Sequence, residues 1–516
     1  MFSETVVILG IPIDNLTIDD SIERIFSMIE SYQRDHRSRL VATVNVDFVV
    51  NTLSWRLSRI RHPELLDILR RADLVTADGM PLVVISKLLG WSLKSRVTGA
   101  DLVPKLAQEA AGRGKSLYLL GGRGKVAKRA ASLLQERNPE LIIAGVDSPF
   151  VYIEGENLFD AEEMDREIVD RVNEARPDIL LIAFGNPKQE VWFNRNRNQL
   201  QVPVSIGIGG TFEYIAGSIR RAPLWMQRSG LEWLFRITQD PGRLWKRYVI
   251  GFFKFGLLIW PAIIYDRYKR LSCKIVCDKN ADSFEVTGQR ISGTFLDVIT
   301  LPGRLDIVTL ESVSGAVDQA FSRPSSVVLD FTQVYFVDST GLGFLMRTLR
   351  RAEKQGCELY LVGITSKIRR VFELNRTWDF FQNNTLEKVD EVISRLRARD
   401  KLPRFYYSST NKPGLTVLDF FGRLDAKQME TLDAKKLISS IANDCIINLG
   451  QLDFVDSSGL MLLIKIQKML VTSGKKCVLC ALKVNVEQLF RITSLDRLFH
   501  IAPDLDSAQQ LIERTL

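Results

Sequence analysis

The sequence Asp338-Ser339-Thr340-Gly341-Leu342 recurs 118 positions later as Asp456-Ser457-Ser458-Gly459-Leu460. Each copy follows an apolar run that ends in Phe-Val. Upstream, Gly303-Arg304-Leu305-Asp306 recurs as Gly422-Arg423-Leu424-Asp425 at a spacing of 119, so one residue has been inserted between the two landmarks. Self-similarity over this length indicates two folded units of one type. The C-terminal half of the chain is therefore predicted to be a tandem repeat, and the chemistry is expected elsewhere.

Length and composition indicate a multidomain globular protein. The chain has 516 residues, of which 46% are apolar and 25% charged, and three domains are expected at ~100 to 200 residues each. Its N-terminus lacks the basic region of a signal peptide, which predicts a cytoplasmic location. Six scattered cysteines fit free thiols better than a zinc site or a disulfide framework. Three histidines leave little material for a Ser-His-Asp hydrolase or a histidine-rich metal site.

The first 245 residues alternate between strand-like and helix-like stretches, which predicts a mostly parallel α/β sheet with covered faces. The expected helices include 101–112, 125–137 and 162–175. The expected strands are Thr5 to Leu9, Leu40 to Val44, Ser116 to Leu120, Ile142 to Gly145, Ile179 to Phe184 and Val204 to Ile208.

Ligands in such sheets bind beyond the carboxyl ends of the strands, where polar and glycine-rich residues follow these runs. Asp78 is one of them, and its alternative role is to cap the next helix. Arg96 could instead pair with a surface acid. The glycine-rich turns could cradle a phosphate through backbone N–H groups, or serve only as tight turns. The candidate phosphate-binding glycines are Gly121, Gly122, Gly124, Gly209 and Gly210.

The segment from Gly217 to Lys274 is basic and rich in tryptophan. It holds twelve Lys or Arg against three acids, and four of the eight tryptophans. Its apolar run, Val249 to Ile264, is shorter than the ~20 residues of a membrane-spanning helix. These features favour a segment lying in an anionic membrane interface; a buried helix is the alternative, and nucleic acid is not an expected partner. The residues expected to contact the membrane are Lys246, Arg247, Phe252, Phe253 and Trp260.

Several separated motifs between Val6 and Tyr248 resemble those of the WecG/TagA/CpsF glycosyltransferases. This ordered series is specific to that family. The motifs are Thr43-Val44-Asn45; Ala72-Asp73-Leu74 through Ala77-Asp78-Gly79; Arg96-Val97-Thr98-Gly99-Ala100-Asp101; Gly185-Asn186-Pro187-Lys188-Gln189-Glu190; and Arg220-Arg221-Ala222-Pro223 through Gly230-Leu231-Glu232-Trp233.

The resemblance implies transfer of a sugar, commonly of the N-acetylmannosamine type, from a UDP-sugar to a polyprenyl-pyrophosphate-linked glycan on the cytoplasmic membrane face. Asp78 matches the base proposed for the family. The residues expected to bind substrate are Thr43, Asn45, Arg96, Gln189, Arg221, Arg236 and Arg243, the last two in a basic segment that completes the site. A departure from the family pattern is the stretch Leu53-Ser54-Trp55-Arg56, which looks inserted and bears on the identity of the acceptor.

An inverting, metal-independent reaction without a cofactor is predicted. Inverting transfer needs a carboxylate to accept the proton of the acceptor hydroxyl, and positive charge to stabilise the departing diphosphate. Metal-dependent transferases commonly hold the diphosphate through Asp-x-Asp. The one such triplet in this chain is Asp504-Leu505-Asp506, far from the α/β domain. Arginines and helix N-termini are therefore expected to serve.

Each repeat resembles the STAS domain of anti-sigma-factor antagonists, over Ser283 to Val392 and Pro403 to Leu516. The resemblance implies small α/β domains, a protein partner such as a kinase or an anti-sigma-like protein, and phosphorylatable serines at Ser339 and Ser457. The alternative role of these hydroxyls is to cap a helix.

The predicted architecture is a Rossmann-like transferase domain (1–248), a membrane-associating segment and linker (249–282), and two STAS-type domains (283–392 and 403–516), with 395–401 between the repeats. The alternative to an enzyme is a signalling or scaffold protein whose transferase domain binds nucleotide-sugar without turnover.

Overall fold

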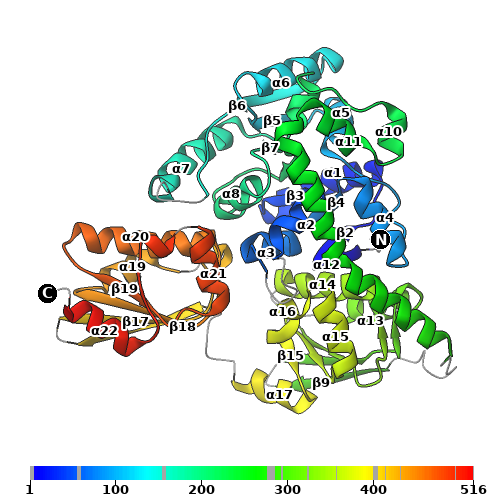
Figure 1. Cartoon of the computed structure of the whole chain (residues 1–516). Helices are drawn as coiled ribbons and strands as arrows, with labels where there is room; N and C mark the ends of the chain where they lie inside the picture. Colours follow the sequence, from blue (N-terminus) through cyan, green and yellow to red (C-terminus); the bar gives the residue numbers. More distant parts are fainter. Residues whose placement is uncertain are drawn as a thin grey trace.

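The computed structural model describes residues 5–54, 60–153, 158–275, 285–291, 294–321, 325–355, 357–398, 405–412, 414–429, 432–493 and 495–514. It contains an N-terminal α/β domain, two smaller α/β repeats and one long helix that runs beside the N-terminal domain and the first repeat (Figure 1). The predicted fold class is confirmed.

The N-terminal domain is built on a six-stranded parallel sheet with the order β4-β3-β8-β7-β5-β6. Alternate residues of one strand enter different hydrophobic clusters, because side chains of a strand point to opposite faces. Val41 packs with α1 and α5 side chains on one face, whereas Ala42 and Val44 pack on the other. The strands are β3 (Arg39–Val44), β4 (Leu74–Ala77), β5 (Ser116–Gly121), β6 (Ile142–Asp147), β7 (Ile179–Ala183) and β8 (Val204–Gly207).

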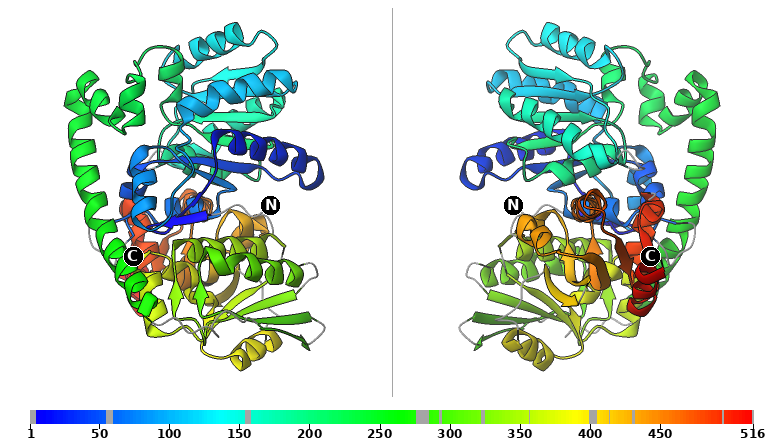
Figure 2. Two further views of the ribbon diagram at one scale, coloured as in Figure 1. Left: turned by 90° about the vertical axis from the view of Figure 1, so that its right-hand side faces the viewer. Right: turned by 90° about the vertical axis from the view of Figure 1, so that its left-hand side faces the viewer.

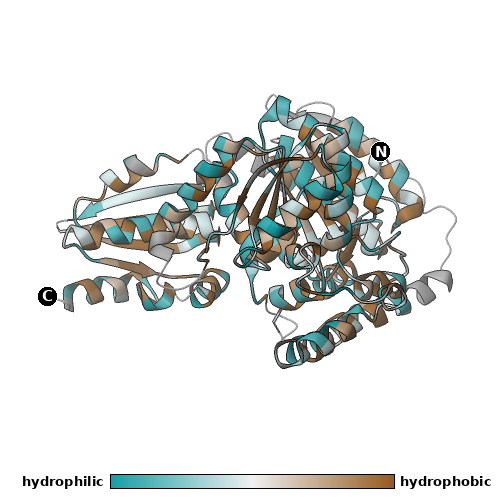
Figure 3. Ribbon diagram, turned by 90° about the horizontal axis from the view of Figure 1, so that it is seen from above, coloured by the Kyte–Doolittle hydropathy of each residue, from teal (hydrophilic) through white to brown (hydrophobic). Residues whose placement is uncertain are grey.

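Helices cover both faces of this sheet, as a parallel sheet requires. The hydropathy colouring in Figure 3 shows apolar strands between helices that are polar on their outer sides. The principal helices are α1 (Ile18–Asp35), α2 (Val46–Thr52), α3 (Pro63–Arg71), α4 (Met80–Leu88), α5 (Gly99–Gly112), α6 (Val126–Arg137), α7 (Leu158–Ala175), α8 (Lys188–Asn196) and α9 (Thr211–Ile215).

The first predicted strand does not join the parallel sheet. Residues Thr5–Ile8 form β1, which pairs antiparallel with β2 (Ile11–Asp14) in a separate hairpin. The expectation that all the early apolar runs belong to one sheet is therefore wrong for this run. Asp14 ties the hairpin to the sheet, since its Oδ2 accepts a hydrogen bond of 2.9 Å from the Val75 N–H of β4.

The two repeats have the same sheet topology, which bears out the internal duplication. The first has the order β9-β10-β12-β14-β15 and the second β16-β17-β18-β19-β20. In both, an antiparallel hairpin is followed by parallel strands. Their bounds are β9 (Glu285–Ile291), β10 (Thr294–Thr300), β12 (Ser325–Asp330), β14 (Leu359–Val362) and β15 (Thr385–Leu386) in the first repeat; and β16 (Phe405–Lys412), β17 (Leu415–Leu424), β18 (Asp444–Val455), β19 (Cys477–Cys480) and β20 (His500–Ala502) in the second.

Both copies of the Asp-Ser-[Ser/Thr]-Gly motif begin a helix. These helices are α14 (Ser339–Gln355) and α20 (Ser457–Thr472). The cap is the aspartate: Asp338 Oδ1 accepts from the Gly341 N–H at 2.9 Å, and Asp456 Oδ1 from the Gly459 N–H at 3.0 Å. The alternative in which the serine hydroxyl caps the helix is therefore wrong.

Helix α12 (Pro241–Ile275) is longer than the apolar run expected from the sequence, and the predicted boundary at residue 248 falls inside it. Figure 2 shows it along one side of the molecule, spanning the N-terminal domain and the first repeat. Within Leu244–Tyr268 an 18-residue window reaches a mean hydropathy of 1.7, so the helix is long and apolar enough to cross a membrane, by length and composition alone. The predicted linker 395–401 begins in helix α17 (Val389–Ala398), and the rest of it lies outside the described residues.

Candidate active site

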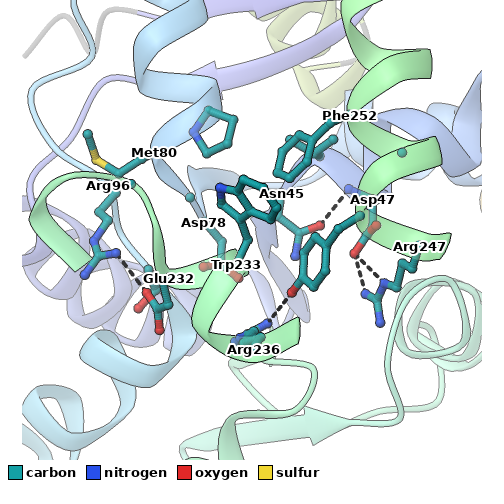
Figure 4. Close-up of a pocket in the computed structure, with 17 residues that line it drawn as sticks. Asn45, Asp47, Asp78, Met80, Arg96, Glu232, Trp233, Arg236, Arg247 and Phe252 are labelled. Atoms are coloured by element: carbon teal, nitrogen blue, oxygen red, sulfur yellow. Dashed lines mark hydrogen bonds and ion pairs between the residues drawn. The ribbon is translucent and has the colours of Figure 1, made fainter. Parts of the chain in front are cut away.

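A pocket with about 720 Å³ of empty space lies at the carboxyl ends of β3 and β4. Residues after β3 and β4 form one wall, and α11 (Glu232–Gln239) with the start of α12 forms the other (Figure 4). The lining residues are Asn45, Val46, Asp47, Asp78, Gly79, Met80, Pro81, Arg96, Thr98, Gly230, Glu232, Trp233, Arg236, Arg247, Tyr248, Gly251 and Phe252.

Asp78 is held in this pocket by its backbone. Its N–H donates to the Val44 carbonyl oxygen at 2.6 Å, which extends the pairing of β4 with β3. Helix α4 begins immediately afterwards with Gly79 at the cap position and no side-chain capping bond, so the helix-capping alternative for Asp78 is wrong. Burial raises the pKa of the carboxyl to about 6, and this rise is opposed by the positive charge of Arg236. A carboxylate with a pKa near neutrality is suited to accept a proton.

Arg96 also lines the pocket and is already paired. Its Nη1 donates to Glu232 Oε2 at 3.0 Å, and its Nη2 donates to Gln227 Oε1 at 3.0 Å. Arg221 does not line the pocket; it supports this cluster through an ion pair with Asp101 and a 3.6 Å contact with Glu232. The alternative in which Arg96 pairs with a surface acid is therefore wrong, because its acidic partner, Glu232, lines the pocket.

Arg236 is different, because no ion pair joins it to a carboxylate among the described residues. Its Nη1 donates to the Tyr248 hydroxyl at 3.3 Å, and the guanidinium lies 4.9 Å from the centroid of the Tyr214 ring. Its Nε is buried and makes no hydrogen bond. The guanidinium therefore has an unused donor beside Asp78.

A third group of pocket residues consists of Asn45, Asp47 and Arg247. Asn45 caps α2, and its Oδ1 accepts from the Asp47 N–H at 3.0 Å. Arg247 of α12 donates through Nε to Asp47 Oδ2 at 2.8 Å. Arg247, expected at the membrane, thus lies in the pocket, where it joins α12 to the strand ends.

Thr43 and Gln189 lie behind the pocket rather than in its lining. Thr43 Oγ1 donates to the Gly207 carbonyl at 2.8 Å, bridging β3 and β8. Gln189 Oε1 accepts from the N–H groups of Gly185 and Gly209, at 3.2 and 3.1 Å, so it holds two loops together. Neighbouring Glu190 is fully buried, which raises its pKa to about 7. These residues fix the strand ends that carry the site.

The glycine-rich turns do not line the pocket. Gly121 and Gly122 follow β5 with φ of 102° and 80°, which favour glycine, and Gly124 has φ of 56°. A Cβ at Gly121 would lie 2.8 Å from the Ala183 carbonyl oxygen, so close strand packing also requires this glycine. Gly210 caps α9, beside Gly209. Their role in phosphate binding stays a prediction.

The other predicted residues occupy diverse environments. Phe252 lines the pocket, whereas Phe253 and Trp260 are exposed on α12, as is Lys246. Arg243 lies in α12, but its side chain is outside the described residues. Ser339 and Ser457 are buried, and neither hydroxyl makes a hydrogen bond.

Several pocket residues escaped the sequence reasoning. Tyr248 lines the pocket and Tyr214 lies against Arg236, and both are single aromatic residues without a motif. The pairing of Asp47 with Arg247 joins positions 200 apart. The sequence did point to Glu232, because this residue stands in the Gly-Leu-Glu-Trp motif. No group of three or more His, Cys, Asp or Glu side chains that could hold a metal occurs in the described part of the chain.

Comparisons with known proteins match the N-terminal domain and the two repeats to different families. Residues 6–269 match the family model described as glycosyl transferase WecG/TagA/CpsF family, and residues 290–392 and 406–508 match that of the STAS domain. The chain is 29% identical over 246 residues to the N-acetylglucosaminyldiphosphoundecaprenol N-acetyl-beta-D-mannosaminyltransferase of Bacillus subtilis (strain 168), covering 47% of this chain and 87% of that protein.

The protein of the same name from Staphylococcus aureus (strain MW2) is 29% identical over 240 residues, covering 46% of this chain and 85% of its own. Among solved structures, an anti-sigma factor antagonist from Mycobacterium paratuberculosis matches with a TM-score of 0.20 and 20% identity, over 22% of this chain and 98% of that one.

Proposed function

The chain belongs to the WecG/TagA/CpsF glycosyltransferase family and carries two STAS domains, and on that premise we propose that it transfers an N-acetylmannosamine-type sugar from a UDP-sugar to a polyprenyl-pyrophosphate-linked acceptor. Its relatives' names support a glycosyltransferase with a lipid-linked acceptor. The observation that carries the proposal is Asp78, a carboxyl with a pKa of about 6 among three arginines of one pocket.

In the proposed reaction, an acceptor hydroxyl oxygen attacks the anomeric carbon of the donor sugar. Asp78 takes the hydroxyl proton while the bond from the anomeric carbon to the UDP oxygen breaks, and the diphosphate leaves with the electron pair. Attack opposite the leaving group inverts the anomeric centre. With a pKa of about 6, most Asp78 side chains are ionised at pH 7 and ready to accept the proton.

Arg236 is assigned to the leaving diphosphate. Arg96 and Arg247 are balanced by Glu232 and Asp47, whereas Arg236 has a buried Nε without a hydrogen-bond partner. A guanidinium already in place stabilises charge that develops in the transition state without reorganisation. In this scheme the arginine takes the electrostatic role of a metal ion, and the reaction needs no cofactor.

We assign the protein to the inner face of the cell membrane as a peripheral protein. One face of α12 is buried against the N-terminal domain, where the Lys254 ammonium donates to the Val50 carbonyl at 2.7 Å. The opposite face exposes apolar residues at helical spacing, with Phe253 67% and Trp260 60% exposed. A helix held along one face and apolar on the other suits an in-plane position at a lipid surface. The exposed apolar residues of this face are Trp245, Val249, Ile250, Phe253, Leu257, Trp260 and Ile264.

The pocket opens beside this helix, since Arg247, Tyr248, Gly251 and Phe252 of α12 line it. A lipid-linked acceptor could therefore enter from the membrane with its polar head towards Asp78. The STAS domains are assigned regulatory or partner-binding roles, with Ser339 and Ser457 as phosphorylation candidates.

The test is UDP release by the purified full-length chain with a panel of UDP-sugars and short-chain polyprenyl-pyrophosphate-linked N-acetylglucosamine. We expect release that requires both donor and acceptor. Donor binding without release under any combination would favour the scaffold alternative, in which the domain binds nucleotide-sugar without turnover.

A further inference from the structure

Helix α3 of the transferase domain is contacted by both STAS domains. Towards its C-terminal end, Arg70 Nη1 pairs with Asp379 of the first STAS domain at 2.6 Å, and Arg71 pairs with Glu353 of the same domain. Towards its N-terminal end, Glu64 and Asp67 contact the second STAS domain. The helix precedes β4, at whose end Asp78 stands. The tandem therefore contacts an element close to the pocket.

The first STAS domain is joined to the transferase domain by apolar packing. Val7 of the N-terminal hairpin belongs to the hydrophobic core of this STAS domain, together with Leu345 of α14. Gly343 of α14 faces the Thr5 backbone so closely that a Cβ would not fit. Polar contacts add to this, such as the Trp91 Nε1 donating to Asp338 Oδ2 at 2.9 Å. A shared core indicates a permanent attachment.

The second STAS domain docks through polar contacts, and its hydrophobic clusters contain residues of its own domain alone among the described residues. The Ser457 N–H at the start of α20 donates to Glu64 Oε1 at 2.8 Å. Asn194 of α8 donates to Asp456 Oδ2 at 3.1 Å, and Asp67 lies 3.5 Å from Arg423. Figure 1 shows this domain as a separate lobe beside α3 and α8. Polar interfaces between domains are typical of reversible docking.

The start of α20, where it contacts α3, is poorly suited to an additional negative charge. Ser457 is 4% exposed, and its hydroxyl has no hydrogen-bond partner. Burial and the nearby Glu64 raise the pKa of Asp456 to about 8, so Asp456 is mostly protonated at pH 7. The interface thus disfavours two ionised carboxylates side by side. Asp67 and Asp425 add to this acidity, and Arg423 and Arg195 offset it in part. A further charge at Ser457 would face Glu64 at close range.

We propose that the start of α20, Asp456 to Gly459, is a reversible docking surface whose partner is α3 of the transferase domain in the same chain, and that negative charge at Ser457 releases the second STAS domain. The first STAS domain stays attached and keeps its ion pairs with Arg70 and Arg71. A protein that recognises this helix start must displace α3 to bind. This inference goes beyond the proposed function, and its readouts need no turnover.

The test compares the full-length chain with Ser457→Asp by small-angle X-ray scattering and amide hydrogen exchange. Ser473→Asp is the matched control, because Ser473 lies exposed at the other end of α20. We expect Ser457→Asp to increase the radius of gyration and to speed exchange in the peptide that contains the start of α20 by about tenfold or more. Unchanged exchange in β18 and β19 would show that the domain stays folded.

Glu64→Gln supplies the rescue. The amide oxygen of glutamine can still accept the hydrogen bond of residue 457 but carries no charge, so Ser457→Asp with Glu64→Gln should return towards the compact form. A compact Ser457→Asp protein would overturn the proposal, as would a wild-type chain that is already extended. A double variant as extended as the single one, or a Ser473→Asp protein that opens equally, would overturn the role of the charge facing Glu64.

Discussion

Replacing Asp78 with Asn should separate its catalytic role from a structural one, because rate and stability are expected to change in opposite directions. Loss of a general base costs ~10² to 10⁴ in rate. The amide keeps the shape of the carboxylate, so donor binding should persist. In the wild type, the rate should fall below pH 6 as Asp78 takes up a proton before the acceptor can deliver one.

The stability change follows from the pKa of Asp78, which rises from its ordinary value of 3.8 to about 6 on folding. A raised carboxyl pKa means that the folded domain binds the proton more tightly than the unfolded chain does. Ionised Asp78 therefore costs stability above about pH 6, and this cost disappears as pH falls below about 4. Each pKa unit corresponds to ~1.36 kcal/mol, so Asp78→Asn should stabilise the transferase domain at pH 7 by at most about 3 kcal/mol.

The assays are acceptor-dependent UDP release and thermal unfolding at pH 4 and pH 7. We expect a rate lower by at least about a hundredfold, and a transferase-domain Tm that rises at pH 7 but not at pH 4. Wild-type turnover by Asp78→Asn would refute its role as the base. A Tm that falls at pH 7 would refute the assignment of a destabilising buried carboxylate.

Three further tests concern Arg236, the need for a metal and the lipid contact of α12. Arg236→Gln should lower kcat by ~10² to 10³, as removal of one donor to a developing anion does elsewhere, whereas Arg137→Gln, exposed at the end of α6 and outside the pocket, should leave kcat unchanged; equal rates for Arg236→Gln and wild type would remove Arg236 from the diphosphate site. Excess chelator should leave UDP release unchanged, and inactivation that Mn²⁺ or Mg²⁺ reverses would contradict the metal-independent mechanism. Phe253→Glu with Trp260→Glu should release the protein from anionic vesicles, while Lys105→Glu on α5 should not; retention of the double variant would place the lipid contact elsewhere.

The sequence predicted those parts of the fold that depend on local patterns. Five of the six strands of the parallel sheet followed from apolar runs and both repeats followed from duplication, but β4 was not among the expected strands. Asn45 and Asp78 were placed at the carboxyl edge of the sheet because ligands bind there in parallel sheets. The hairpin of β1 and β2 was not predicted. Its apolar run resembles a sheet strand, and its burial depends on α14 of another domain.

Long-range pairings were also beyond the sequence pattern. The basic residues of α12 indicated a lipid surface as a group, but only the folded chain shows that Arg247 pairs with Asp47 at the pocket. The motif at Ser457 suggested a cap or a phosphorylation site. That its backbone N–H contacts Glu64, 393 positions away, depends on how the domains dock. Neither the charge pattern nor the motif determines which distant residues these groups contact.

The mass of the acceptor after a single turnover tests the central claim most directly. Purified chain in excess over polyprenyl-pyrophosphate-linked N-acetylglucosamine, incubated with UDP-N-acetylmannosamine, should yield a lipid product heavier by one N-acetylhexosamine residue. Stoichiometric UDP release should accompany it. An acceptor of unchanged mass, with donor bound but intact, would contradict the assignment of this chain as a transferase.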